Sequence, residues 1–309
     1  MSDLFRTNRR LPVAAACLAA VLLVVLSFKN AGSLGGATQL QDDDDVALDK
    51  PPPVCPGPVL KPSERQEPWN KKFTKKLNEE VAVKDANKGC ELVFYGDSIT
   101  ETWRATDGGR ACPRSRCEGV SEVFQRYFGH FSTSVLAVGG DQAMHLLYRL
   151  QHGQVYKKHQ PKLATVMIGT NDLGAASCLG GESAILQSAA GTLDRIIQNV
   201  QYLLGENPTT HILVVGLLPR GSWEEPEDMF KLPSDFSSAI YAVNHALDRY
   251  AFGNKHTHFI DCTKHFVQDG MLSPELMPDA LHPNAAGMAL LAECILPFVK
   301  LYGGAGMQA

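Results

Sequence analysis

Apolar and polar positions along this chain follow two alternating periods, and the changes from one period to the other predict its secondary structure. Short apolar runs bounded by turn residues predict five strands, at residues 91–96, 132–138, 163–168, 212–218 and 258–262. Between them, apolar side chains recur at helical spacing, as at Leu146, Leu147 and Leu150. The predicted helices cover residues 69–83, 119–128, 142–152, 184–204, 234–251 and 285–301.

Strands that are apolar along their whole length and are separated by helices are typical of a parallel sheet covered on both faces. Right-handed crossovers then give a three-layer αβα sandwich with a five-stranded parallel sheet, as in flavodoxin-like folds. The chain has 309 residues, of which 44% are hydrophobic and 20% are charged. This is enough for one domain of about 240 residues with appendages. We place that domain at residues 69–309.

The N-terminal part has a different pattern. An uncharged run from Leu11 to Phe28 follows a tail, residues 1–10, that carries three arginines. As a helix the run would reach about 27 Å, enough for the hydrocarbon core of a bilayer. We interpret residues 11–29 as a signal-anchor, with a cleaved signal peptide and, less favoured, an organelle transit peptide as alternatives. The positive charge before the run favours a cytosolic tail and a lumenal or extracellular body, secreted if cleavage occurs.

Residues 30–68 are rich in Pro, Gly and Asp and lack apolar periodicity, so they are expected to form a linker. The formal net charge of −4 shows no basic excess, which gives a nucleic-acid partner no support. A small or neutral substrate fits this charge better. An uncleaved segment 11–28 would add the membrane as a partner, and the sequence does not indicate an oligomeric state.

Seven cysteines lie outside the apolar run, so at least one must be free or paired with another chain. Cys112 and Cys117 flank four polar residues and could close a small loop in an oxidising compartment. Cys262 and Cys294 sit in apolar settings and are expected to be buried thiols. No cysteine spacing indicates a metal site, and we expect neither a metal nor another cofactor.

Chemistry-bearing residues follow the first strand and recur near the C-terminus. Gly96-Asp97-Ser98 places a hydroxyl at the edge where open α/β sheets carry their active sites, although a turn serine or helix N-cap would use the same residues. Asp279 precedes His282 by three residues, so its carboxylate could hold one ring nitrogen while the other accepts a proton. A helix-capping loop with a surface histidine is the competing interpretation of this pair.

Two more polar turns follow predicted strands. Gly140, in Val-Gly-Gly-Asp, would let its backbone N–H approach a substrate, and the Asn171 amide is a neutral donor for a developing negative charge. Ordinary strand-to-helix turns use the same residues. We expect Asp141 and Asp172 to hydrogen-bond loop amides rather than take part in catalysis.

The blocks around Ser98, Gly140, Asn171 and the Asp279–His282 pair resemble those of the SGNH (GDSL) hydrolase superfamily, over roughly residues 90–300. In finer detail, two blocks are similar to the catalytic subunits of platelet-activating factor acetylhydrolase IB. They are Gly139-Gly140-Asp141 with the following His145-x-x-Tyr-Arg-Leu, and Leu217-Leu218-Pro219-Arg220-Gly221. The resemblance implies a nucleophile at Ser98, a general base at His282 and its orienting partner at Asp279. It implies an oxyanion hole formed by the backbone N–H groups of Ser98 and Gly140 and the Asn171 amide.

The resemblance implies an esterase that cleaves a carboxylic ester, with a short acyl group such as acetyl, on a lipid or a glycan. An O-acetyltransferase acting on a glycan could use the same serine chemistry. An inactive binding module on this scaffold is a third possibility, which the presence of every catalytic position disfavours. Trp103 and Trp223 could stack on a sugar, but as isolated aromatic residues they are better explained by packing.

Overall fold

The computed structural model describes residues 55–222 and 228–304. Its centre is a five-stranded sheet in the order β4-β1-β5-β6-β7, in which all neighbouring strands are parallel. The strands are β1 Leu92–Gly96, β4 Thr133–Ala137, β5 Leu163–Met167, β6 His211–Val215 and β7 Thr257–Ile260. This arrangement confirms the predicted fold class. The tail, the apolar segment 11–29 and Trp223 lie outside the described residues.

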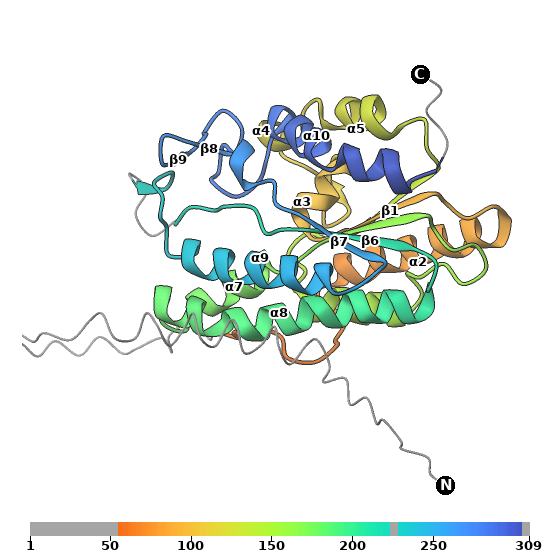
Figure 1. Ribbon diagram of the computed structural model, residues 1–309, viewed down its shortest axis with the longest axis horizontal. Coiled ribbons are helices and arrows are strands. Elements are labelled where there is room, and N and C mark those ends of the chain that lie inside the picture. Colours follow the sequence, from red (N-terminus) through yellow and green to blue (C-terminus); the bar gives the residue numbers. More distant parts are fainter. Residues whose placement is uncertain (1–54, 223–227, 305–309) are drawn as a thin grey trace, which may run out of the picture.

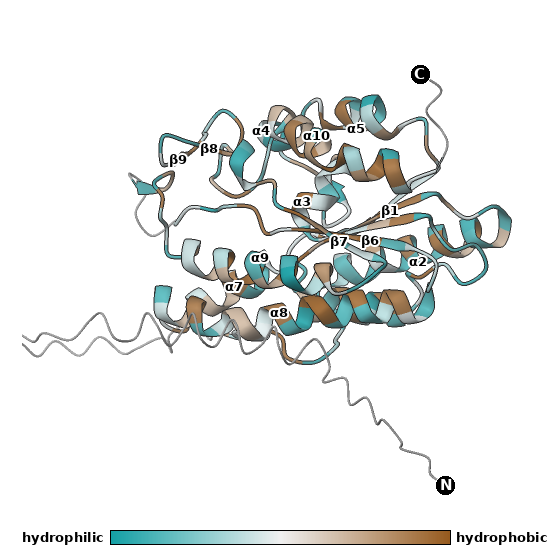
Figure 2. Ribbon diagram, viewed as in Figure 1, coloured by the Kyte–Doolittle hydropathy of each residue, from teal (hydrophilic) through white to brown (hydrophobic). Residues whose placement is uncertain are grey.

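Helices cover both faces of the sheet (Figure 1). One face carries α2 Pro68–Asn87, α6 Ala143–Gln151, α7 Thr170–Ser177, α8 Gly181–Glu206 and α9 Ser237–Phe252, and the other carries α5 Val120–Phe128 and α10 Ala285–Tyr302. Within β1, Val93 and Tyr95 join one core, whereas Leu92 and Phe94 join the other. Because both faces are covered, β1 is buried along its whole length, and brown, hydrophobic colouring is prominent on it in Figure 2.

Several short elements complete the fold and were not predicted. They are α3 Ser98–Glu101, η1 Thr102–Arg104, β2 Thr106–Asp107, β3 Arg110–Ala111, α4 Arg114–Cys117, η3 Thr263–His265, β8 Val267–Gln268 and β9 Met271–Leu272. Each is too short to show a hydrophobic period. The helix α7 was also missed, because its eight residues, Thr-Asn-Asp-Leu-Gly-Ala-Ala-Ser, begin with turn-forming types.

Three disulfides connect the described cysteines, Cys55–Cys178, Cys112–Cys117 and Cys262–Cys294. The small loop closed by Cys112 and Cys117 was predicted. The expectation that Cys262 and Cys294 are buried thiols was wrong, because the fold brings the end of β7 beside α10 and the two sulfurs pair. Among the described residues Cys90 alone is free, and it is buried, so the expectation of at least one unpaired cysteine is confirmed.

Residues 55–67 were expected to belong to the linker, yet they pack onto the body. Cys55 is bonded to Cys178 directly after α7, and the backbone N–H of Val59 donates to Oε1 of Gln142 at 2.6 Å. Nothing in a proline-rich run without apolar periodicity indicates such contacts. Residues 55–67 therefore pack against the domain placed at residues 69–309.

Within the described ranges one helix, α10, is long and apolar enough to cross a membrane by length and composition alone. Its residues Met288, Leu291 and Ile295 are buried in the core that also contains Leu92 and Phe94. Contact with the sheet therefore accounts for these apolar residues of the helix.

An aromatic cluster fixes α5 and η1 to the sheet. Phe128 lies 5.1 Å from Phe94, 5.3 Å from Phe124 and 5.8 Å from Trp103, measured between ring centroids. The Trp103 side chain is buried, which supports the packing interpretation of this residue. Aromatic side chains contribute much of the burial in a core of this size.

Truncation of the cluster should destabilise the whole domain. We expect Phe128→Ala to lower the free energy of unfolding by about 3–5 kcal/mol, because it removes a fully buried ring and leaves a cavity. The matched control is Phe252→Ala, since Phe252 is 97% exposed and should change stability by less than about 0.5 kcal/mol. Urea unfolding of both variants measures this, and equal effects would contradict the assignment of the core.

Candidate active site

Ser98 lies directly beyond the sheet, as the first residue of α3. The strand β1 ends at Gly96, and the Asp97 carboxylate caps the helix by accepting the Ile99 backbone N–H at 3.0 Å. Gly96 has no room for a side chain, because an added Cβ would lie 2.5 Å from the carbonyl oxygen of Met167. Asp97 therefore serves as the N-cap, and the Ser98 hydroxyl is available for another partner.

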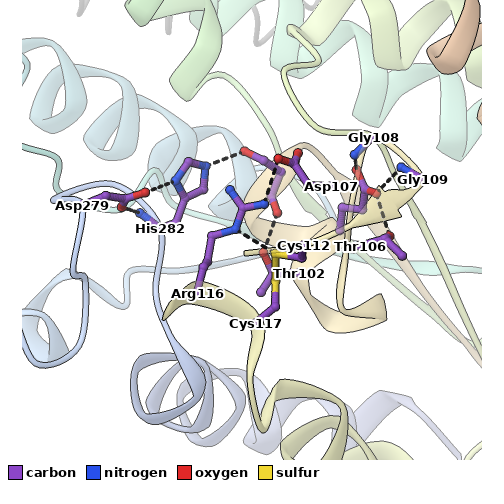
Figure 3. Close-up of a disulfide and its surroundings, with 12 residues drawn as sticks. Thr102, Thr106, Asp107, Gly108, Gly109, Cys112, Arg116, Cys117, Asp279 and His282 are labelled. Carbon is purple, nitrogen blue, oxygen red and sulfur yellow. Dashed lines mark hydrogen bonds and ion pairs between the residues drawn. A yellow bond between two sulfur atoms is a disulfide. The ribbon is translucent and has the colours of Figure 1, made fainter. Parts of the chain in front are cut away.

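That partner is His282. Ser98 Oγ lies 2.9 Å from His282 Nε2, and His282 Nδ1 lies 2.7 Å from Oδ2 of Asp279. The other oxygen, Oδ1, accepts the backbone N–H groups of His282 at 2.7 Å and Leu281 at 3.1 Å. Burial opposes ionisation of Asp279, but these hydrogen bonds and the nearby imidazole hold its pKa below the ordinary value. The fold thus joins hydroxyl, imidazole and carboxylate in one chain, of which Figure 3 labels the Asp279 and His282 members.

The glycine and asparagine turns lie at the same edge of the sheet. Gly96 pairs in register with Ala137 on one side and with Met167 on the other, so the chain continues on both sides into the two predicted turns. Gly140 adopts a φ of +79°, and an added Cβ there would lie 2.8 Å from Nη1 of Arg65. The Asn171 amide donates to the carbonyl oxygen of Asp141 at 2.9 Å, which brings this side chain against the Gly140 turn.

Glu101 connects α3 to these turns and was given no role from the sequence. Its buried carboxylate accepts the backbone N–H of Gly139 at 2.6 Å and those of Gly108 and Gly109 at 2.8 Å each. The Thr106 hydroxyl donates to it at 2.7 Å. A single side chain, three residues after Ser98, therefore fixes the Gly139–Gly140 turn.

The two aspartates after the turns form buried ion pairs. The Asp141 carboxylate accepts a hydrogen bond from the Arg149 guanidinium at 2.7 Å, and the Asp172 carboxylate accepts one from the Arg195 guanidinium at 2.8 Å. Asp172 also accepts the Ala143 backbone N–H at 2.8 Å, as the expected hydrogen bonding to loop amides requires. For Asp141 the partner is a side chain instead. Both carboxylates are thus engaged in holding the loops together.

Two arginines near the site, Arg220 and Arg65, were also given no role from the sequence. The buried Arg220 guanidinium lies 4.0 Å from the centroid of the Phe236 ring and donates to the carbonyl oxygen of Thr170 at 3.0 Å. Burial lowers the pKa of Arg220 to about 10, although the charges of Asp97 and Asp279 act in the opposite direction. Arg65 lies in the segment taken for a linker. For Arg220 the sequence did contain one indication, the Pro-Arg-Gly run at residues 219–221, which is part of the resemblance to the acetylhydrolase subunits.

Within residues 55–222 and 228–304, no three His, Cys, Asp or Glu side chains gather in a way that could hold a metal ion.

This protein is a hydrolase built on a three-layer αβα sandwich, with its candidate site at one edge of the parallel sheet. The chain belongs to the GDSL-like lipase/acylhydrolase family, whose model matches residues 94–290. It is therefore a carboxylic ester hydrolase, as the resemblance of its four blocks implied.

Individual relatives agree with this family. The chain is 27% identical over 233 residues to platelet-activating factor acetylhydrolase IB subunit alpha1 of Bos taurus, covering 74% of this chain and 84% of that protein. It is 25% identical over 208 residues to the alpha2 subunit of Gallus gallus, covering 67% and 75%. A GDSL-like lipase from Bacteroides thetaiotaomicron has a similar fold, with a TM-score of 0.53, 19% identity and coverage of 75% and 98%.

The buried carboxyl of Asp97 should make stability depend on pH. Burial raises its pKa to about 7, so the folded chain holds a proton there that the unfolded chain releases near its ordinary value of 3.8. Stability from this group is therefore present at low pH and is lost as the pH rises toward 7. An asparagine at position 97 would keep an oxygen that accepts the Ile99 backbone N–H, but it would not titrate.

We therefore expect the stability of Asp97→Asn relative to the wild type to increase as the pH rises from about 5 to about 8, with Asp97→Asn clearly the more stable of the two at pH 8. Urea unfolding at both pH values measures the difference, and Asp248→Asn, at an exposed carboxylate, controls for the change in net charge. A difference between wild type and Asp97→Asn that stays constant with pH would contradict the raised pKa.

Proposed function

We propose that this protein hydrolyses a short-chain carboxylic ester, such as an acetyl ester, in two steps through an acyl-enzyme on Ser98. The observation that carries the proposal is the continuous hydrogen-bonded chain from Ser98 through His282 to Asp279, with distances of 2.9 and 2.7 Å. Hydrogen bonds that join a hydroxyl to a base, and that base to a third group that orients it, are typical of an activated nucleophile.

In the first step, His282 Nε2 takes the proton of Ser98 Oγ while the oxygen attacks the ester carbonyl carbon. Asp279 accepts the N–H at Nδ1, which leaves Nε2 as the proton acceptor, and it stabilises the imidazolium that forms. The imidazolium then gives its proton to the departing alcohol. In the second step a water molecule gives a proton to His282 and attacks the acyl carbon. The bond to Ser98 Oγ then breaks, the acid leaves, and His282 returns the proton to Ser98.

The negative charge on the carbonyl oxygen needs fixed donors. As the first residue of α3, Ser98 has a backbone N–H without an intrahelical acceptor. The Gly140 N–H lies in a turn fixed by a positive φ and by Glu101, and one amide proton of Asn171 remains after its bond to Asp141. These three donors are the proposed oxyanion hole.

The relatives and the proposed compartment support the proposed substrate class. The acetylhydrolase relatives support a short acyl group, and a lipid or a glycan can carry it. Three disulfides favour an oxidising compartment, in agreement with a lumenal or extracellular body behind a signal-anchor or cleaved signal peptide at residues 11–29. Hydrolysis of acetylated sugars and acetylated lipids by the full-length protein would separate these two substrates.

Ser98→Ala should lower kcat for p-nitrophenyl acetate by at least about 10,000-fold, because the attacking oxygen is removed while the fold is kept. The matched control is Ser121→Ala, at an exposed serine, which should keep wild-type turnover. Initial rates with the purified full-length protein measure both. Substantial turnover by folded Ser98→Ala would refute the nucleophile assignment.

Asn171→Ala removes one proposed oxyanion donor and should lower kcat by about 100- to 1000-fold with little change in KM. Asn87→Ala, at an exposed asparagine on α2, is the control and should leave both constants unchanged. If Asn171→Ala folds normally and keeps its kcat, the amide has no part in stabilising the oxyanion.

A further inference from the structure

A disulfide-closed loop lies between the two halves of the proposed site. It comprises residues 106–119, which contain the β2–β3 hairpin, the short helix α4 and the Cys112–Cys117 disulfide. At one end, Oδ1 of Asp107 lies 2.5 Å from the position of a Cβ added to Gly139. At the other, a Cβ added to Gly119 would lie 3.4 Å from that of Ala285, three residues after His282. The loop thus reaches from the Gly139–Gly140 turn to the segment that follows His282.

This loop directs Arg116 toward the site. The guanidinium of Arg116 points toward Asp107 and His282 in Figure 3. The Arg116 side chain is only 10% exposed, whereas its neighbour on α4, Arg114, is exposed. Two arginines of one short helix therefore have opposite environments.

The contacts of Arg116 leave much of its donor capacity unused. Its Nε donates to Sγ of Cys112 at 3.2 Å, and sulfur is a weak acceptor. Its Nη2 lies 3.2 Å from Oδ2 of Asp107, but this buried nitrogen makes no well-directed hydrogen bond to any described residue. The Asp107 side chain is itself 37% exposed. A buried guanidinium with unmet donors is costly, since each unsatisfied buried donor loses its hydration.

An anionic ligand group would satisfy these donors. The planar guanidinium presents a rigid fork of N–H groups that matches the oxygens of a carboxylate or a phosphate. In a largely dehydrated position beside the site, such a pair is stronger than one on the open surface.

We propose that Arg116 is a specificity-determining residue, which binds an anionic group, carboxylate or phosphate, carried by the ester that Ser98 attacks. This inference rests on the proposed function and adds the charge of the substrate. The Cys112–Cys117 disulfide holds Arg116 in place, because the arginine lies inside the ring that it closes and donates to one of its sulfurs.

The test compares esters that differ in charge and share the acetyl group. We would measure kcat/KM of the full-length protein for 4-acetoxybenzoate, 4-acetoxyphenyl phosphate and the neutral methyl ester of 4-acetoxybenzoate. Arg116→Ala should lower kcat/KM for at least one anionic ester by about 10- to 100-fold, the range expected for a charge-assisted hydrogen-bonded pair. Which anionic ester loses more distinguishes carboxylate from phosphate.

The neutral ester and a neighbouring arginine supply the controls. With the neutral ester, Arg116→Ala should change kcat/KM by less than about threefold, and Arg114→Ala should leave all three esters within about twofold of wild type. Arg116→Lys should recover part of the loss, because it restores the charge without the fork. Equal losses for charged and neutral esters would mean that Arg116 only supports the loop and would overturn the proposal, as would no loss at all.

Failure of the proposed function would be visible separately. The Ser98→Ala variant should bind 4-acetoxybenzoate without cleaving it, and calorimetry should show weaker binding when Arg116→Ala is added. If Ser98→Ala still cleaves the esters, the nucleophile assignment fails whatever Arg116 does. If the double variant binds 4-acetoxybenzoate and 4-acetoxyphenyl phosphate as well as Ser98→Ala does, the role of Arg116 fails even though Ser98 is the nucleophile.

Discussion

The carboxylate of Glu101 is the interaction on which the geometry of the site depends. It is buried and accepts four hydrogen bonds, from the backbone of Gly139, Gly108 and Gly109 and from the Thr106 hydroxyl. An ionised carboxylate has about four acceptor positions, so this set saturates it. Since Glu101 ends the helix that Ser98 begins, the same four-residue element positions the proposed nucleophile, the Gly139–Gly140 turn of the proposed oxyanion hole and the hairpin that carries Asp107.

Other charged groups hold the same loops from the opposite side. The buried pairs Asp141–Arg149 and Asp172–Arg195 lie on the elements that follow β4 and β5. Buried ion pairs contribute little net stability compared with apolar residues, but a pair with one partner removed is strongly unfavourable. Their effect is therefore to fix one arrangement of the turns. The segment around Arg65 and Val59, attached through Cys55, covers this arrangement from outside.

Much of the fold, and the candidate site residues that follow its strands or lie close together in the chain, could be predicted from the sequence. Buried parallel strands such as β1 are continuous apolar runs, and glycine and polar residues mark their ends, so Ser98, Gly140 and Asn171 stand out. His282 and Asp279 are three residues apart, and their relation is local. Glu101 and Arg116 could not be found this way, because their importance comes from backbone groups and side chains that only the folded chain brings near. The Cys262–Cys294 pair was missed for the same reason.

The central claim is that Ser98 carries the acyl group between the two steps, and acid quenching followed by mass spectrometry tests it most directly. The full-length protein would be mixed with an activated acetyl ester, quenched within the first turnover and digested. We expect one added acetyl group on the peptide that contains Ser98, and none on that peptide in Ser98→Ala. An acetyl group on another residue whose replacement abolishes turnover, with Ser98→Ala fully active, would contradict it.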